Sequence, residues 1–586
     1  MFSGCGRNMS KIKIPIFADI AVILLVSLAA LSGLILSGSW PQSHDGLRYL
    51  CHLDQFRDAF NSGVLYPRWM PNYYGGYGYP IFLFYQPGYF FLSLLFTFFT
   101  SDILAASYAS NVAMFFIGGT GVYLLVMKIA GDRLASLFSS IMFLLTPYVY
   151  VNLFVRGDLS ELLAMFVVPW PLYFLLRLKD RITGNTALAP SMLVLSLMLA
   201  AVVYSHPFTA MFFYPLFCVF MLPMCLDMDR KQALKFLGAG STALLCAVIF
   251  SSPYWFTAFQ MKKYVDYNPA VSGFYSAENH IVYFQQLFSR FWGFLGSEPG
   301  ISDGMSFQLG LPHFILAVAG FWLNRRSKFF ITAFSLYILC IVMMTPAASL
   351  LWKNIPLMNF VQFPWRLLSV IVLLQILCIS GIWKLRGVLE SNVRFCSALV
   401  AFLLLTLLWN ANEFQFIRFK YVIRDAIEFH RQLRLEKMEV YESFNEFVPK
   451  TATSYLPSAA RGNGPMLSVS DPACRISEYP ESNPHHMRYS VSSERPQVIM
   501  VNQLYFPGWK IILGDKDIDG STLLEDISKD GRIQIEIPAG ENQYLEAFYE
   551  GPPGWYARNV FIGIVFLAML VAIMLEHRKI LKETGS

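Results

Sequence analysis

Charged residues are scarce in this sequence. Asp, Glu, Lys and Arg make up 14% of its 586 residues, whereas soluble domains contain about 25%. Hydrophobic residues make up 55% of the chain, and its mean hydropathy is positive. This composition excludes a chain built mainly of water-soluble domains. The net charge of +6 comes from short basic clusters between apolar runs, which is typical of membrane topology and not of nucleic-acid binding.

Several motifs that carry enzyme chemistry are also missing. None of the nine cysteines forms a CxxC pair, so neither a zinc site nor a disulfide framework is indicated. No glycine-rich phosphate loop, HExxH zinc motif or GxSxG nucleophile turn stands in a suitable context. ATP-driven chemistry and serine hydrolysis therefore have no support in the sequence.

Long apolar runs are what the sequence has in abundance. A membrane-spanning helix needs about 20 apolar residues, and the runs that qualify are 15–37, 103–127, 134–154, 160–178, 187–205, 207–227, 234–258, 307–323, 327–345, 364–384, 395–412 and 557–576. The first run is long for the apolar part of a signal peptide, so we expect a retained span. Hydropathy alone does not decide whether a further run, 80–99, crosses the membrane.

The basic loops decide this question. If 80–99 does not cross, the later basic loops fall on the side of the basic N-terminus, as the positive-inside rule requires; they lie at 128–133, 177–181, 230–231, 325–328, 384–386 and 577–579. If it crosses, every later basic loop falls on the opposite side of the membrane from the basic N-terminus, against the positive-inside rule. We therefore predict an interfacial or re-entrant helix at 80–99, twelve spans, and both chain ends on the cytoplasmic side of the cell (inner) membrane.

This topology divides the chain into three parts: a polytopic module at 1–412, an extracytoplasmic segment at 413–556, and a last span with a cytoplasmic tail at 557–586. The first outer loop, 38–102, is large. Residues 413–445 favour a helix, whereas 485–550 alternate apolar and polar residues between turns, which is typical of strands. We expect an all-α membrane bundle of about twelve helices and a β-sandwich-like domain outside.

Polar residues at the outer ends of the spans are candidates for function, because such groups are costly at membrane depth. His44 and Asp45 follow the first span. Asp45 is suited to act as a general base or metal ligand, or it only caps the next helix. Arg68 stands in an aromatic, glycine-rich stretch that continues to Tyr85. That stretch suits stacking on sugar rings, packing along a lipid chain, or anchoring in an aromatic belt.

A second group lies where one predicted span ends outside and the next begins. It contains Arg156, Asp158 and Glu161, and Glu161 lies one turn into the new helix. The group is either functional or a structural pair of Arg156 with Glu161. His206 stands at another outer turn. It either shuttles protons or binds a polar ligand, or it is a buried histidine with satisfied hydrogen bonds.

The stretch NFVQFPWRLL places Arg366 at the start of a span, beside Gln362 and Trp365. A guanidinium there either reaches to lipid headgroups or clamps a phosphate with its planar fork. Gln308 belongs to a loop at 285–310 that is rich in polar and aromatic residues. It either contacts a polar substrate or belongs to an ordinary structured loop.

Several stretches together resemble a known family: SHDGLRYL, YPRWMPNYYGGYGYPIFLFYQP, NLFVRGDLSELLA, YSHPFTA, DGMSFQLG, VQFPWRLL and YFPGWK. They resemble the polytopic membrane proteins labelled 6-pyruvoyl-tetrahydropterin synthase-related and, more loosely, the YfhO-like membrane proteins. Both look like members of the C-type glycosyltransferase (GT-C) superfamily. The resemblance implies an essential acidic residue in the first outer loop, which Asp45 matches, and a polyprenyl-phosphate-linked sugar as donor.

The leading hypothesis is a membrane glycosyltransferase that moves a sugar from a polyprenyl-phosphate donor to an extracytoplasmic glycan, lipid or protein. The expected catalytic residues are His44, Asp45 and Glu161, and the expected substrate-binding residues are Arg68, Tyr85, Arg156, Asp158, His206, Gln308, Gln362, Trp365 and Arg366. No cofactor is assigned, but His44, Asp45 and Glu161 are plausible ligands for a divalent cation. The alternatives are a transporter or assembly factor for lipid-linked polysaccharide, or a receptor whose β domain binds a partner.

Overall fold

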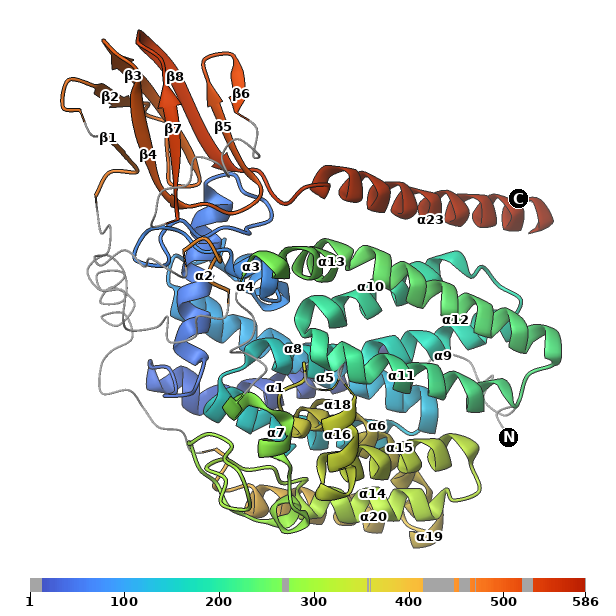
Figure 1. The fold of residues 1–586 in the computed structure, drawn as a ribbon. Coiled ribbons are helices and arrows are strands. Elements are labelled where there is room, and N and C mark those ends of the chain that lie inside the picture. The colour runs from blue at the N-terminus through green and yellow to red at the C-terminus, as the bar shows by residue number, and fades with distance from the viewer. Residues whose placement is uncertain are drawn as a thin grey trace.

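The computed structural model describes residues 13–265, 273–355, 358, 360–414, 447–452, 464–469, 471–518 and 531–584. These residues form a helical bundle with a β-sheet domain at one end (Figure 1). The helix expected at 413–445 lies outside the described residues, apart from a turn at 413–414.

Helices form over the apolar runs, because a backbone in hydrocarbon must satisfy its hydrogen bonds within its own segment. Among the described residues, eight helices are long and apolar enough to cross a membrane, and two bent pairs raise the number to ten. The eight comprise α1 (Lys13–Ser37), α5 (Ile103–Ala130), α8 with α9 (Leu159–Val167 and Pro169–Thr183), α11 (Pro207–Cys225), α12 (Arg230–Phe250), η9 to α19 (Pro364–Leu389), α20 (Asn392–Trp409) and α23 (Trp555–Thr584).

The bent pairs and shorter helices account for the other predicted spans. One pair is α6 (Arg133–Leu144) with the segment 147–156, which contains α7 (Pro147–Tyr150) and the π-helix η2 (Val151–Arg156); the other is α15 (Lys328–Met344) with 346–354, which contains α16 (Ser349–Asn354). The predicted spans 187–205 and 307–323 form α10 (Ala189–Ser205) and α14 (Leu311–Leu323), of only 17 and 13 residues. The described residues therefore do not contain twelve full-length spans.

The run at 80–99 forms two short helices, α3 (Ile81–Phe84) and α4 (Gly88–Thr97). Pro80 and Pro87 directly precede them, and proline is well tolerated at the start of a helix because its missing N–H has no partner there. Ten helical residues extend about 15 Å, half of the hydrocarbon thickness of a bilayer. Neither helix is long enough to cross, so the run matches the predicted interfacial or re-entrant segment in length.

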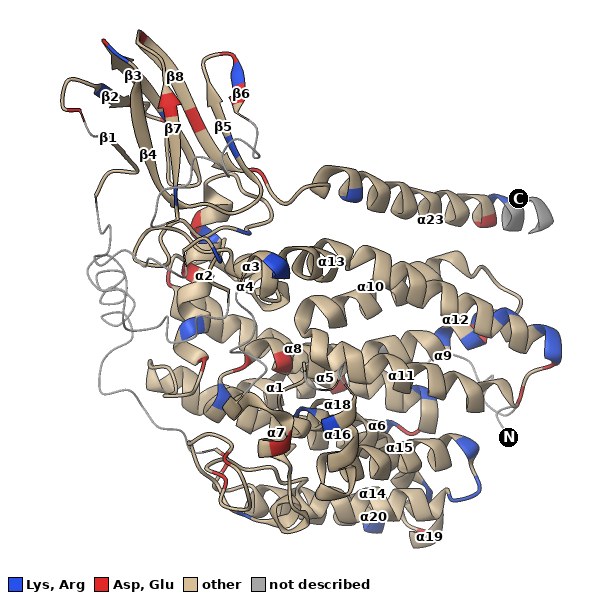
Figure 2. Ribbon diagram, in the orientation of Figure 1, with Lys and Arg blue, Asp and Glu red and all other residues tan. Residues whose placement is uncertain are grey.

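Basic side chains gather at the end of the bundle that faces away from the β strands (Figure 2). The turn between α5 and α6 belongs to this end, and there Arg133 Nε lies 2.6 Å from Asp19 Oδ2 of α1. Arg386 Nη1 lies 2.8 Å from Asp132 Oδ2 in the same turn. This distribution is the one that the positive-inside rule describes.

The β-sheet domain contains two antiparallel sheets. Their strand orders are β1-β4-β7 and β2-β3-β8-β5-β6. The strands are β1 (Leu467–Val469), β2 (Arg475–Glu478), β3 (His486–Ser493), β4 (Gln497–Leu504), β5 (Trp509–Leu513), β6 (Lys516–Ile518), β7 (Arg532–Ile537) and β8 (Gly540–Tyr549). Buried residues of both sheets, such as Ile535 and Leu545, belong to one hydrophobic cluster. The strands begin at Leu467, earlier than the expected position near 485.

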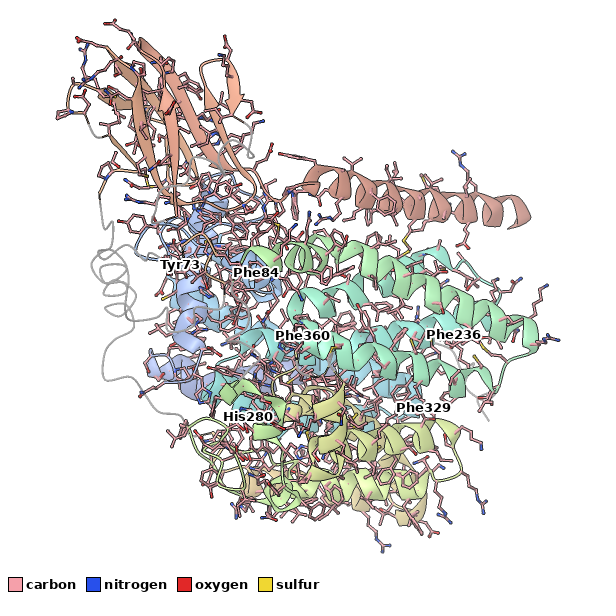
Figure 3. All side chains as sticks on the ribbon, viewed as in Figure 1. Tyr73, Phe84, Phe236, His280, Phe329 and Phe360 are labelled. Carbon is pink, nitrogen blue, oxygen red and sulfur yellow. The ribbon has the colours of Figure 1, made fainter. Side chains whose placement is uncertain are left out.

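The aromatic, glycine-rich stretch of the first outer loop is the docking site of this domain. Trp69, Tyr74 and Tyr77 are buried in the same cluster as the β strands. Trp69 Nε1 donates to Gln503 Oε1 at 2.7 Å, and Gln503 Nε2 donates to the carbonyl oxygens of Pro71 and Gly76 at 3.2 and 3.1 Å. Figure 3 shows the neighbouring Tyr73 and Phe84 below the β strands. The packing of this domain therefore accounts for these aromatic residues.

We predict that Trp69→Phe loosens the β domain. The change leaves buried Gln503 without its indole donor, and an unsatisfied buried polar group costs about 1–3 kcal/mol. Limited proteolysis of the detergent-solubilised protein measures the effect as faster cleavage between the domain and the bundle. Glu536→Ala, on the exposed face of β7, is the control and leaves the cleavage rate unchanged. Equal cleavage rates for Trp69→Phe and wild type contradict the prediction.

Candidate functional site

The residues before α2 (Gly46–Asn61) are fixed to the end of η2 by backbone hydrogen bonds. His44 N donates to Val155 O at 2.9 Å, and Asp45 N donates to Arg156 O at 2.8 Å. Gly157 has a φ of +68° and has no room for a Cβ against the backbone of Gly46. The backbone therefore holds Asp45 beside Arg156 and leaves its side chain available.

Asp45 is the N-cap residue of α2, but its carboxylate makes no capping hydrogen bond. Ser43 Oγ accepts from Gly46 N at 3.2 Å instead. The interpretation of Asp45 as only a helix cap is therefore wrong. Its side chain is 34% exposed and lies 3.5 Å from Arg48 Nη1. Burial lowers the pKa of His44, against the opposing charge of Asp45, so the ring is neutral near pH 7 and its Nε2–H donates to Phe294 O at 3.2 Å.

Arg156 is the centre of a buried polar cluster. Its Nη1 lies 2.8 Å from Glu161 Oε2 and its Nη2 lies 2.9 Å from Asp158 Oδ2. Nη1 also bonds Tyr148 Oη at 3.1 Å and the side-chain oxygen of Asn152. Tyr148 donates to Glu161 Oε1 at 2.5 Å. The predicted Arg156–Glu161 pair is thus present, within a larger network.

Asp158 joins this cluster to α2. It caps α8 by accepting from Glu161 N at 3.0 Å, and the same oxygen accepts from Tyr49 Oη at 2.9 Å. Burial opposes ionisation of Asp158, but the charge of Arg156 and the backbone N–H of Glu161 outweigh it and lower the pKa of Asp158. The ring of Tyr85 lies 5.9 Å from that of Tyr49. Burial, with Asp45 and Asp158 nearby, raises the pKa of Tyr85, so its hydroxyl keeps its proton.

Arg366 approaches the cluster from the 3₁₀ turn η9 (Pro364–Leu367). Its Nη1 donates to Val361 O at 2.8 Å and to Gln362 Oε1 at 2.9 Å. Its Nε is buried without a hydrogen-bond partner and lies 3.9 Å from Glu161 Oε2. The ring of Trp365 lies 4.6 Å from Arg156 Cζ. The FPWR and RGD stretches, some 200 positions apart, therefore meet.

His206 completes the cluster. Its Nδ1 accepts from Thr209 N at 3.3 Å and lies 2.8 Å from Thr209 Oγ1. Because Nδ1 accepts a backbone N–H, the proton of the neutral ring is on Nε2. Nε2 lies 3.9 Å from Glu161 Oε2. Four polar groups therefore converge on Glu161: the hydroxyl of Tyr148, the guanidinium groups of Arg156 and Arg366, and the imidazole of His206.

Two of the expected substrate-binding residues lie outside this cluster. Arg68 donates from Nη2 to Glu550 O at 2.8 Å, at the base of the β domain. Gln308 donates to Glu413 Oε1 at 2.7 Å and accepts from Trp409 Nε1 at 2.9 Å. Phe307, the residue before Gln308, has its ring 5.7 Å from that of Trp365.

A candidate set of metal ligands exists, but it differs from the expected one. Ligand atoms of Asp158, Glu161 and His206 lie within 4.8 Å of one another. The expected set of His44, Asp45 and Glu161 does not form such a group among the described residues, because His44 faces the carbonyl of Phe294. A cation bound by Asp158 and Glu161 competes with Arg156 for the same carboxylates.

Sequence reasoning missed Tyr49, Tyr148 and Ser369. Tyr49 lies four residues after Asp45, and this helical spacing was an available indication that both face the same site. Tyr148 lies in a run that reads as apolar. Ser369 accepts from Thr209 Oγ1 at 3.2 Å, across 160 positions of sequence. No local pattern reports such a contact.

We predict that Arg156→Met destabilises the protein by about 3–5 kcal/mol, because it leaves buried carboxylates without their partner. The double variant Arg156→Met/Glu161→Gln recovers part of the loss, since Glu161 is fully buried and is then uncharged. Thermal unfolding in detergent measures both changes. Arg325→Met, at an exposed position, is the control. No recovery in the double variant contradicts the account.

Glu413, which accepts a hydrogen bond from Gln308, is a buried carboxyl group. Burial raises the pKa of Glu413 to about 9, so the folded protein holds a proton that the unfolded chain releases above about pH 4.3. The stabilisation from this proton is complete below that pH and is lost as the pH rises towards 9. In Glu413→Gln, thermal unfolding should lose this part of its pH dependence. Glu390→Gln, at an exposed position, should keep the wild-type dependence, and an unchanged profile in Glu413→Gln refutes the assignment.

Comparison with known proteins finds similar solved structures and a matching family. The chain is similar to structures of an oligosaccharyltransferase from Archaeoglobus fulgidus. One is AglB in complex with an inhibitory peptide and a dolichol-phosphate, with 12% identity and a TM-score of 0.42, covering 72% of this chain and 58% of that one. Another is the apo form, with 13% identity and a TM-score of 0.42, covering 71% and 58%.

The chain thus spans less than two thirds of the length of those structures. No curated protein matches it. Residues 82–416, more than half of the chain, match the family described as "6-pyruvoyl-tetrahydropterin synthase related domain; membrane protein". The chain therefore belongs to this family of membrane proteins.

Proposed function

We propose that this protein is a GT-C-type glycosyltransferase that transfers a sugar from a polyprenyl-phosphate donor to an acceptor outside the cytoplasm. The acceptor is a glycan, a lipid or a protein. In the predicted topology the basic end of the bundle faces the cytoplasm, and the Arg156 cluster stands at the outer ends of the spans. A lipid-phosphate donor suits short basic loops that have no room for a nucleotide-binding domain.

One observation carries the proposal: the backbone of Asp45 is fixed to that of buried Arg156, while its carboxylate takes no part in capping its helix and is partly exposed. A carboxylate in this position can accept the proton of an acceptor hydroxyl. The acceptor oxygen then bonds to the anomeric carbon as the bond from that carbon to the phosphate oxygen breaks. The products are an inverted glycoside, protonated Asp45 and polyprenyl phosphate.

Arg366 is suited to receive the departing phosphate. Arg156 is already neutralised by two carboxylates at 2.8 and 2.9 Å. Arg366 has none closer than 3.9 Å among the described residues, and its Nε has no hydrogen-bond partner. Preorganised donors of this kind stabilise charge that develops in the transition state. Gln362 and Trp365 hold Arg366 and Arg156 in place.

The β domain is the proposed holder of the acceptor. It docks on the aromatic stretch that leads to Tyr85, whose ring lies 5.9 Å from that of Tyr49 in the helix that Asp45 precedes. If a divalent cation acts here, Asp158, Glu161 and His206 would hold it and it would supply further positive charge for the phosphate. Loss of transfer on addition of EDTA, with recovery on addition of Mn²⁺ or Mg²⁺, would reveal such a cation.

We predict that Asp45→Asn lowers the transfer rate by about 10²–10⁴-fold, the range for loss of a general base, and leaves thermal stability nearly unchanged. The assay supplies purified protein with a panel of polyprenyl-phosphate sugars and follows free polyprenyl phosphate. Asp58→Asn, an exposed carboxylate on the same helix, is the matched control. Wild-type activity in Asp45→Asn refutes the base assignment. Movement of intact donor without any free polyprenyl phosphate identifies a transporter instead.

A further inference from the structure

Arg68 is a buried cation without a neutralising carboxylate among the described residues. It is 8% exposed, and its Nε and Nη1 have no hydrogen-bond partner. Its polar contact is the bond from Nη2 to the carbonyl of Glu550, and its Cζ lies 4.2 Å from the ring centroid of Trp555. A buried charge without a partner is strongly unfavourable, so an additional group of opposite charge near Arg68 would stabilise this arrangement.

A cleft of about 470 Å³ lies directly against Arg68. It is lined by residues 508–510, 517–518 and 550–557, between the base of the β domain and the start of α23. Three of its lining residues touch Arg68, namely Glu550, Gly551 and Trp555. Gly551 has a φ of +125°, and a Cβ there would stand 2.7 Å from Arg68 Nη1. The guanidinium therefore lies behind the cleft wall that Glu550, Gly551 and Trp555 form.

The cleft presents charges of both signs. Lys510 Nζ lies 3.1 Å from Asp517 Oδ2, and both residues line the cleft together with Glu550. Tyr556 and Ala557 also line it, in the first turn of α23. Backbone N–H groups in the first turn of a helix have no partner within that helix and favour anions. A ligand that carries both a phosphate and an ammonium group matches these charges.

The cleft lies at a membrane boundary, because α23 is a candidate span that begins at Trp555. Tyr556 is 65% exposed beside it, and Tyr and Trp are enriched where a span meets the headgroup zone. The apolar surface of α23 is exposed along its span, so the headgroup of a phospholipid packed against α23 would be within reach of this cleft.

We propose that this cleft binds the headgroup of a zwitterionic phospholipid of the phosphatidylethanolamine type. The phosphate lies against Lys510 and the first turn of α23, with Arg68 behind the Gly551 backbone. The ammonium lies towards Glu550 and Asp517. The site is separate from the Arg156 cluster, so its test does not depend on sugar transfer.

Native mass spectrometry of protein released from nanodiscs with equal amounts of phosphatidylethanolamine and phosphatidylglycerol tests the proposal. We expect wild type to retain one phosphatidylethanolamine and to select it at least tenfold over phosphatidylglycerol. Lys510→Gln and Arg68→Met each lower that retention about tenfold. Lys516→Gln, an exposed change on the neighbouring strand that does not line the cleft, retains it fully. Lys510 is itself partly exposed, so this variant is informative even if Arg68→Met does not fold.

Three results overturn the proposal. The first is equal retention of the two lipids by wild type, and the second is unchanged retention in Lys510→Gln. The third is found with delipidated protein: equal thermal stabilisation by inorganic phosphate and by short-chain phosphatidylethanolamine assigns the cleft to free phosphate.

Discussion

The buried guanidinium of Arg156 is the group on which the arrangement of the other site residues depends. A buried charge is tolerated only when it is paired and fully hydrogen-bonded. This requirement brings Tyr148 and Asn152 from one helix end to Asp158 and Glu161 at the start of the next. The backbone carbonyl of Arg156 then fixes Asp45. One cation thus positions two helix ends and the first outer loop.

The first outer loop connects this cluster to the β domain. Its aromatic stretch is buried with the β strands and continues into the short helices α3 and α4. Tyr85, between these helices, packs against Tyr49. Gln503 binds this stretch through both its carbonyl and its amide group. The domain and the cluster therefore share one structural element. In the proposed function, the first outer loop would bring an acceptor held by the β domain to Asp45.

The sequence predicted the parts of the fold that depend on hydrophobicity and length. Apolar runs became helices because a bilayer leaves a backbone few other options. The basic loops predicted that 80–99 does not cross, and this run forms two helices that are each too short to cross. Span lengths were predicted less well: the expected span at 307–323 begins only at Leu311 after Gly310. Polar side chains at membrane depth are energetically unfavourable unless they have polar partners. On this ground the sequence predicted one group of residues that contains Arg156, Asp158, Glu161, His206 and Arg366.

Contacts between distant parts of the chain could not be predicted in this way. Arg68 looked like a site residue, but its partners Glu550 and Trp555 follow almost 500 positions later. Gln308 bonds Glu413 across 105 positions. Tyr148 escaped notice because tyrosine in an apolar run has no feature that separates a hydrogen-bonding role from packing.

The central claim is that the Arg156–Arg366 region separates a sugar from a lipid phosphate. The most direct test uses proteoliposomes and a polyprenyl-phosphate sugar with different isotopic labels on the sugar and the phosphate. The account predicts that each sugar label reaching the acceptor is accompanied by one labelled polyprenyl phosphate left in the membrane. Arrival of both labels on the acceptor, or translocation of the intact donor without cleavage, would contradict it.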